Sequence, residues 1–292
     1  MVAAPGEAFS EYLGARTMKI ETQTVIEPKT GWQLIDWKEL RSYKDLYYFL
    51  VWRDIKVLYK QTVLGFAWAV IQPFLGMMVF SIVFGRLAQV PSDGVPYPIF
   101  SYVALVPWTY FATAMTESTQ SLINNRIMLT KVYFPRLLIP MTPVVAKLVD
   151  FGIAFVLLVV MMTWFSTEPT WGVVFLPPLV LLMMLTASGV GMWLSALAIQ
   201  YRDVRFAIPF IAQLLMYAAP VVWPASLIPQ QFRLLYGLYP MAGVIEGFRS
   251  ALLGTNPMPW DLILPGSLSA AVIALAGAFY FRRLERYFAD VA

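Results

Sequence analysis

The sequence predicts an all-α, polytopic membrane protein with six transmembrane helices, an N-terminal amphipathic interfacial helix and two short re-entrant outer helices between spans five and six. Hydrophobic residues make up 59% of the chain and charged residues 13%, whereas about a quarter of the residues in a soluble domain are charged. The mean hydropathy is +0.66. The apolar residues gather in blocks that are long enough to cross a bilayer as helices. These observations indicate one helical bundle in a membrane.

The N-terminal region is charged and precedes the first apolar block. Residues 1–30 lack an apolar stretch of signal-peptide length, so we expect a flexible, uncleaved cytoplasmic segment. In residues 31–60, apolar and aromatic residues recur at helical spacing while basic residues occupy another arc, which is typical of an amphipathic helix in the membrane interface. Its basic residues Arg53, Lys56 and Lys60 are the predicted contacts with a lipid phosphate. An anchor for the first span is an equally weighted alternative.

Residues 61–284 form the predicted transmembrane domain, and residues 285–292 form a cytoplasmic tail. Proline, glycine or charged residues separate the apolar blocks from one another. Each block has the length of a membrane-crossing helix. The predicted spans are residues 61–84, 98–122, 141–165, 172–199, 206–223 and 262–281.

Basic residues are distributed unevenly between the two sides of these spans. Eighteen of the 21 lysines and arginines fall on the side that holds both termini, the 123–140 loop and the 200–205 turn. The other side holds Arg86, Arg233 and Arg249. Since lysine and arginine are in excess in cytoplasmic loops, we expect both termini in the cytoplasm. The same rule explains the basic pI of about 9.2 without a nucleic-acid partner.

Two apolar pieces between spans five and six, residues 232–239 and 241–253, are each too short to cross the bilayer and are separated by Pro240. A broken backbone at membrane depth is tolerated only where protein or a water-filled path covers it. The pair therefore predicts the outer mouth of a conduit, and a structural cap over the bundle is an equally weighted alternative. The predicted outer gate consists of Tyr239, Pro240, Glu246 and Arg249.

Ionisable residues within the apolar blocks are functional candidates by default. Lys147 and Asp150, and likewise Glu246 and Arg249, are three residues apart, so pairing within a helix is the preferred interpretation. Glu117 has no partner nearby in the sequence. The chain contains no cysteine and no histidine, which removes thiolate chemistry and the usual general base and metal ligand. We therefore predict no catalytic residue and no metal site.

Five stretches carry a resemblance to a known family: "RSYKDLYYFLVWRDIKVLYKQTVLGFAWAVIQP", "VPWTYF", "NNRIMLTKVYFPRLLIPMTPVVAKLVDF", "YAAPVVWP" and "YPMAGVIEGFRSALLG". Together they resemble the membrane subunit of type-2 ABC exporters of polysaccharides and polyol phosphates, with Ala104 standing where a glycine is expected. The resemblance implies a homodimer with two copies of a separate ABC ATPase. It also implies a lipid-linked polysaccharide as substrate, with O-antigen favoured over capsule or teichoic acid, and the bacterial inner membrane as location.

The sequence is consistent with a separate ATPase that supplies the energy of ATP hydrolysis. It lacks the G-x-x-x-x-G-K-[ST] motif and has no Gly-Lys pair, so no cofactor is expected on this chain and ATP and Mg belong to the partner. The resemblance places an ATPase-coupling helix in the loop after span two. There an asparagine, Asn124 or Asn125, can cap a short helix, Phe134 offers an apolar anchor, and Arg126, Lys131 and Arg136 can meet acidic groups. A plain positive-inside anchor is the alternative.

Aromatic residues make up 15% of the chain and include ten tryptophans. Aromatic rings suit the apolar faces of sugar rings and allow sliding. In the family that the sequence resembles, spans one and five face the channel, which makes Trp68, Phe74, Tyr217 and Trp223 candidates for it. Trp108, Tyr110 and Phe111 are predicted near an outer mouth. Lipid-facing packing or anchoring at the interface is the alternative for each ring.

The sequence thus predicts a permease that extrudes a lipid-anchored glycan and is not itself an enzyme. Two other classes remain as alternatives. A membrane glycosyltransferase acting on lipid-linked sugars needs acidic residues in a cytoplasmic loop, and few are present there. A secondary transporter is expected to show inverted repeats, and the sequence shows no internal repeat.

Overall fold

The computed structural model describes residues 41–60, 65 and 67–285, and this part of the chain is helical with connecting turns and no strand. The all-α class is thereby confirmed. The predicted N-terminal segment 1–30, the start of the interfacial helix at 31–40 and the tail after Glu285 lie outside the described residues. The helices are α3 Lys44–Lys60, α4 Ala67–Phe80, η1 Ser81–Leu87, α5 Tyr97–Asn124, α6 Arg126–Lys131, α7 Leu138–Ala146, α8 Leu148–Trp164, η2 Trp171–Phe175, α9 Leu176–Gln200, α10 Asp203–Ala218, η3 Ala225–Leu227, α11 Gln230–Gly237, α12 Pro240–Leu253 and α13 Trp260–Glu285.

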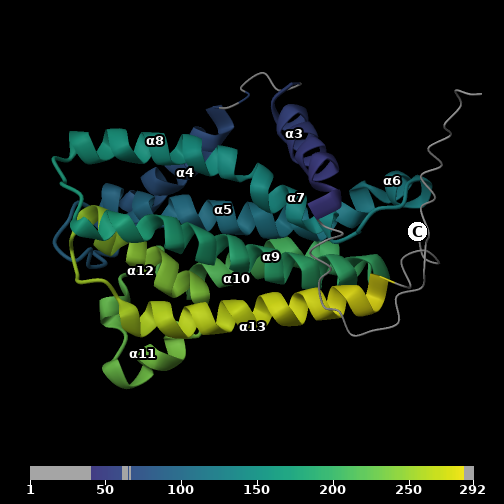
Figure 1. The fold of residues 1–292 in the computed structure, drawn as a ribbon. Coiled ribbons are helices and arrows are strands. Elements are labelled where there is room, and N and C mark those ends of the chain that lie inside the picture. The colour runs from purple at the N-terminus through teal and green to yellow at the C-terminus, as the bar shows by residue number, and fades with distance from the viewer. Residues whose placement is uncertain (1–40, 61–64, 66, 286–292) are drawn as a thin grey trace, which may run out of the picture. The chain divides into compact units, whose positions relative to one another are not determined.

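Helix α9 packs between α5 and α13, and the three run side by side (Figure 1). Of the most apolar part of α5, 78% is buried inside the protein, compared with 11% for the first span, which α4 and η1 form. Small residues bring α9 and α13 close together, because a Cβ atom added to Gly189 on α9 would lie only 2.7 Å from the Cα atom of Ala274 on α13. Because apolar burial does not drive association in lipid, such small residues allow the backbone contact that holds two helices together.

Within the described residues, five helical segments are long and apolar enough to cross a membrane. They are Ala67–Leu87, Tyr97–Asn124, Leu138–Trp164, Trp171–Gln200 and Trp260–Glu285. They correspond to predicted spans one to four and six. The described part of the first begins at residue 67, and the predicted start at 61 lies outside the described residues. The third is divided at Lys147, between α7 and α8.

The predicted fifth span is shorter in the structure than in the sequence analysis. Helix α10 has 16 residues and ends at Ala218, five residues before the predicted end at 223. Ala219 is extended, as expected for the residue before a proline. At a rise of about 1.5 Å per residue, α10 spans roughly 24 Å, less than the bilayer core of about 30 Å. The six-span count therefore stays a prediction.

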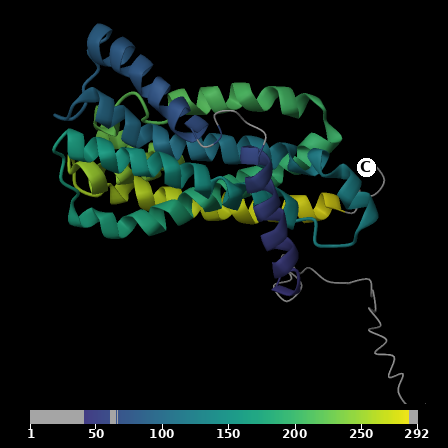
Figure 2. The ribbon, with the colours of Figure 1, turned by 90° about the horizontal axis from the view of Figure 1, so that it is seen from above.

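The two ends of the bundle carry different elements. Figure 1 shows α6 and the last turns of α13 at one end and α11 at the other. The first end is tied together by Arg136, whose Nη1 donates to the carbonyl oxygen of Glu285 at 2.7 Å. Helix α3 crosses the long helices at a steep angle (Figure 2), and the hydroxyl of Tyr47 joins it to α7 by donating to the carbonyl oxygen of Met141 at 3.1 Å. Among the segments predicted on the cytoplasmic side, the 123–140 loop and the last turns of α13 thus share one end of the fold.

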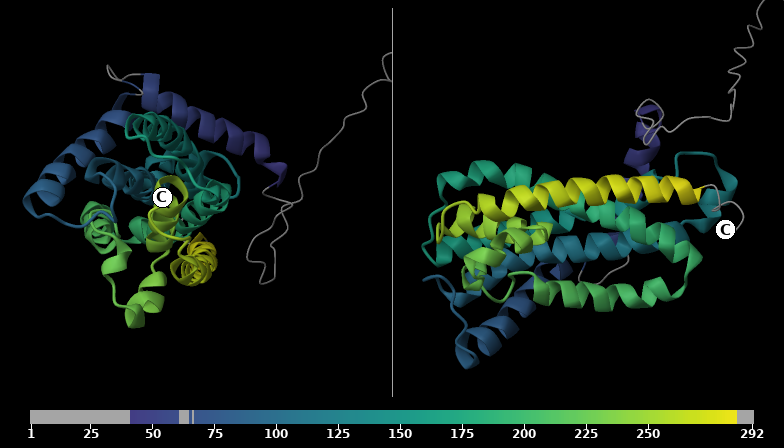
Figure 3. Two further views of the ribbon diagram at one scale, coloured as in Figure 1. Left: turned by 90° about the vertical axis from the view of Figure 1, so that its left-hand side faces the viewer. Right: turned by 90° about the horizontal axis from the view of Figure 1, so that it is seen from below.

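Helices α4 and α10 both lie at the periphery. Figures 2 and 3 show them along the same edge of the bundle. Apolar side chains remain exposed on each, including Trp68 and Leu75 on α4 and Phe206, Phe210 and Leu214 on α10. This edge therefore presents an apolar face that the described part of the chain does not cover.

Candidate functional site

The predicted coupling segment contains one short helix, α6, directly after the end of α5. Asn125 occupies the position before α6, but its side chain makes no capping hydrogen bond, so the predicted cap is wrong. Instead, its Nδ2 donates to the carbonyl oxygen of Ser121 at 2.8 Å and its Oδ1 accepts from Nη2 of Arg53 at 2.8 Å. The side-chain oxygen of Asn125 thus binds Arg53, 72 residues away, instead of capping α6, and this bond connects the coupling segment to α3.

Phe134 is not available as an anchor for another subunit. Only 3% of its surface is exposed, and its ring packs in a core cluster with Leu122 and Phe281. The chain is extended at Val132, where α6 has ended. Val132 and Tyr133 are 54% and 67% exposed there, and Ile127 on α6 is 72% exposed. The exposed apolar surface of the segment thus includes Ile127, Val132 and Tyr133 but not Phe134.

The basic residues predicted for coupling divide into two groups. Arg126 and Lys131 lie at the two ends of α6 and are exposed. Arg136 is partly buried, and its guanidinium and backbone N–H both bond to Glu285 at the end of α13. Arg126 and Lys131 therefore remain candidates for an acidic partner, whereas Arg136 fastens the segment to α13.

The three basic residues of α3 that are predicted to contact a lipid phosphate differ in the groups that surround them. Arg53 forms a salt bridge with Asp54 at 2.8 Å in addition to its bond with Asn125. The ammonium of Lys56 lies 5.1 Å from the ring centre of Trp52, a cation–π contact, and Lys60 is exposed at the end of the helix. For Lys56 and Lys60 the contact with a lipid phosphate stays a prediction, while Arg53 is engaged by groups of the protein.

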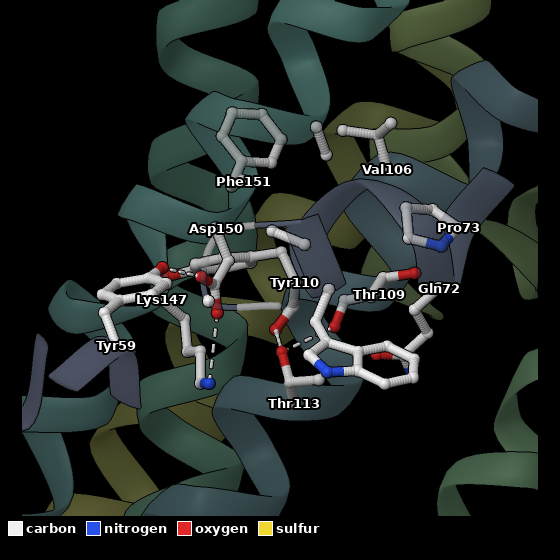
Figure 4. Close-up of a pocket in the computed structure, with 14 residues that line it drawn as sticks. Tyr59, Gln72, Pro73, Val106, Thr109, Tyr110, Thr113, Lys147, Asp150 and Phe151 are labelled. Carbon is white, nitrogen blue, oxygen red and sulfur yellow. Dashed lines mark hydrogen bonds and ion pairs between the residues drawn. The ribbon is translucent and has the colours of Figure 1, made fainter. Parts of the chain in front are cut away.

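A cluster of charged residues joins α3, α5 and α8. Lys147 is 5% exposed, and its ammonium lies 2.7 Å from Glu117 and 3.2 Å from Asp150. The predicted Lys147–Asp150 pair is confirmed, and Glu117 also has a partner, 30 residues away, that the sequence did not reveal. The hydroxyl of Tyr59 donates to Asp150 (Figure 4). Burial and this hydrogen bond raise the pKa of Tyr59, so the hydroxyl keeps its proton.

Tyr59, Lys147 and Asp150 of this cluster form one wall of a cavity of about 230 Å³. The lining includes Trp68 and Gln72 from α4, and Thr109 and Thr113 from α5. Figure 4 shows Gln72, Thr109 and Thr113 across from Lys147 and Asp150. Sequence analysis singled out the tryptophan and the charged residues but missed the glutamine and the threonines. Their only sequence signal is that they are polar residues within apolar helices.

The predicted channel aromatics lie in two kinds of environment. Trp68, Phe74 and Tyr217 are 53%, 39% and 51% exposed on α4 and α10. Trp223 is partly buried, with its ring centre 5.7 Å from that of Tyr236. The rings predicted near an outer mouth differ, because they are buried in the chain's own core on α5: they are Trp108, Tyr110 and Phe111, at 4%, 3% and 1% exposed. We therefore keep only the first four as candidates for a channel surface.

The predicted outer-gate residues form a network at the start and in the middle of α12. The Glu246–Arg249 pair is confirmed, with Nη1 of the arginine 2.7 Å from Oε1 of the glutamate. Arg249 is 1% exposed, donates from Nη2 to the carbonyl oxygen of Val221 at 2.9 Å and lies 3.6 Å from the ring centre of Phe100. Tyr239 donates to the carbonyl oxygen of Leu215 at 3.2 Å, and Pro240 begins α12. The network fixes the segment after α10 against α5 and α12.

A family model described as ABC-2 type transporter matches residues 45–253, from the start of α3 to the end of α12. The chain belongs to the ABC-2 type transporter family. Its relatives include the O-antigen export system permease protein RfbA of Myxococcus xanthus, 28% identical over 86% of this chain and 96% of the relative. The protein of the same name from Klebsiella pneumoniae is 26% identical over 85% of this chain and 95% of the relative. The polysialic acid transport protein KpsM of Escherichia coli is 21% identical over 69% of this chain and 78% of the relative.

Membership of the ABC-2 family confirms the resemblance to the permease subunits of type-2 ABC exporters. The apolar helices of membrane-spanning length in the described part of the chain, together with the family, make this chain a multi-pass membrane protein. The family also favours a transporter subunit over the membrane glycosyltransferase and secondary-transporter alternatives.

Proposed function

We propose that this chain is the permease subunit of an ATP-driven exporter that moves lipid-linked O-antigen from the cytoplasm to the outer face of the bacterial inner membrane. The substrate passes through a channel between two copies of the chain, and both termini lie in the cytoplasm. The observation that carries this proposal is the match to O-antigen permeases over 95% and 96% of their own length.

Two copies of a separate ABC ATPase, which hold ATP and Mg, drive the cycle. The exposed apolar side chains of Ile127 and Tyr133, with Arg126 and Lys131 beside them, support docking at α6. Buried apolar anchors provide most of the energy of a protein interface, and charged residues at the rim add specificity. The bonds of Asn125 and Arg136 then carry a displacement of α6 to α3 and α13.

The test is deletion of the gene in the native host, with complementation by the intact chain. Surface O-antigen should be lost while lipid-linked glycan accumulates inside the cell, and a tagged chain should co-purify with an ATPase from the native membrane. Undiminished surface O-antigen in the deletion strain contradicts the proposal. Loss of the glycan from both compartments points to the glycosyltransferase alternative instead.

A further inference from the structure

We propose that the cavity between α4, α5 and α8 is a binding site for a single neutral sugar ring. This inference rests on the proposed function and assigns to one protomer a specific contact with the glycan part of the substrate. It follows from the size of the cavity, from its polar groups and from its charge.

The size of the cavity limits its occupant to one small ring. Its volume is about 230 Å³, whereas pockets for drug-sized ligands hold roughly 300–1,000 Å³. The cavity lies beside Trp68, which is 53% exposed and lines the same space. One ring of a longer glycan can therefore enter while the rest of the glycan stays outside.

The polar groups of the cavity match those of a sugar. The amide of Gln72 and the hydroxyl of Thr109 make no side-chain hydrogen bond to the described residues, although both line the cavity. Lys147 has three donors and two carboxylate partners, which leaves one N–H for an occupant. The indole of Trp68 adds an aromatic face for the C–H side of a pyranose. The hydroxyl groups of one ring can thus satisfy the amide, the hydroxyl and the ammonium together.

The charge of the cluster excludes the phosphate part of the substrate. Among the described lining residues Lys147 is the one cation, and it already pairs with two carboxylates, Asp150 in the lining and Glu117 outside it. An anionic ligand would compete with these carboxylates for Lys147, and the low dielectric of the membrane interior would strengthen its repulsion by them. A neutral sugar meets no such barrier, so the phosphate groups must bind elsewhere.

The test places a photoreactive benzoylphenylalanine at Gln72 in the full chain, in cells that make the ATPase and the glycan. After illumination, the purified chain is oxidised with periodate and labelled with a hydrazide that reports attached sugar. A second variant carries the probe at Thr109, in case the first does not fold. The matched control carries it at Thr163, an exposed threonine on α8 whose hydroxyl bonds only within its own helix.

We expect sugar labelling at Gln72 or Thr109 and none at Thr163. Substituting Thr109→Val beside the Gln72 probe should lower the labelling about 2- to 10-fold, the effect of one lost hydrogen bond, while Thr163→Val should leave it unchanged. Labelling should also vanish in cells that cannot assemble the lipid-linked glycan. Equal labelling at all three positions, none at the two cavity positions, or persistence without the lipid-linked glycan overturns the inference. If the variant with the probe at Gln72 takes up no sugar label but still gives normal surface O-antigen, the sugar site alone is rejected. Export that does not depend on the chain would instead reject the proposed function.

Discussion

Arg249 combines a buried salt bridge, backbone hydrogen bonds and an aromatic contact in one side chain. The planar guanidinium presents several donors in fixed directions, and an ammonium does not. We expect Arg249→Lys to lose the bond to Val221 and to weaken the contact with Phe100. Breaking a buried ionic network costs about 3 kcal/mol, which corresponds to a fall in Tm of roughly 6–12 °C for a protein of this size. Thermal unfolding of the detergent-purified chain measures the change.

Arg233→Lys is the matched control for that substitution. Arg233 also forms a salt bridge, with Asp261 at 2.7 Å, but the two side chains are 30% and 46% exposed. Exposed pairs contribute about 0–1 kcal/mol, so the Tm should stay within a few degrees of the original. Equal losses of Tm for the two substitutions would contradict the structural role assigned to Arg249.

Lys147 is the only positive charge in its cluster with Glu117 and Asp150 among the described contacts. We expect Lys147→Met to lower the Tm by roughly 6–12 °C, because two partly buried carboxylates then lose their counter-charge. Glu117→Gln should cost less, since Lys147 keeps Asp150 as partner. The same unfolding assay ranks the two variants, and a smaller loss for Lys147→Met than for Glu117→Gln would rule out this account of the cluster.

At the scale of elements, the segment after α6 exposes the ring of Tyr133 on the surface and buries the ring of Phe134 in the core. We expect Ile127→Asp to abolish co-purification of the ATPase with little change in Tm, because it puts a charge on an exposed apolar contact. Phe134→Ala should instead destabilise the fold by about 3–5 kcal/mol, the cost of emptying a core position of phenylalanine. Co-purification and thermal unfolding are measured for both variants.

The control for the docking prediction is Ile127→Leu, which keeps the apolar surface and should retain the ATPase. If Ile127→Asp still binds the ATPase at the original stoichiometry, α6 is not the docking element. If Phe134→Ala leaves the Tm unchanged and loses the ATPase, the assignment of Phe134 to the core is wrong.

The boundaries of the second span followed closely from the sequence, and tertiary contacts did not. The second span was predicted at 98–122 and is observed at Tyr97–Asn124, because a long apolar block between polar segments defines a membrane helix by itself. The burial of Phe134 and the bond between Arg53 and Asn125 depend on helices distant in the sequence. Local patterns carry no information on such contacts. The polar wall of the cavity was missed for the same reason, since Gln72 and Thr109 meet only through packing of α4 on α5.

At the scale of the whole molecule, the apolar edge formed by α4 and α10 must meet lipid or another copy of the chain. The exposed residues Phe206, Phe210, Leu214 and Tyr217 of α10 are spaced four, four and three apart, so they form one stripe on the helix. Most homo-oligomers have closed symmetry, and in the two-fold dimer proposed above the same surface of each copy would face its counterpart. We expect this stripe to lie near the dimer axis.

The absence of cysteine from the sequence makes this expectation directly measurable. A single Leu214→Cys substitution, treated in native membranes with a flexible bis-maleimide, should give a covalent dimer, because each copy presents its thiol near the axis. Val160→Cys on α8 is the control: its side chain is 57% exposed, similar to 52% for Leu214, but Figure 1 places α8 away from α10. A dimer from the Val160 variant alone would move the interface to α8. Cross-linking by neither variant would remove the basis for a channel between two copies along α10, and Tyr217 would then be a lipid-facing residue.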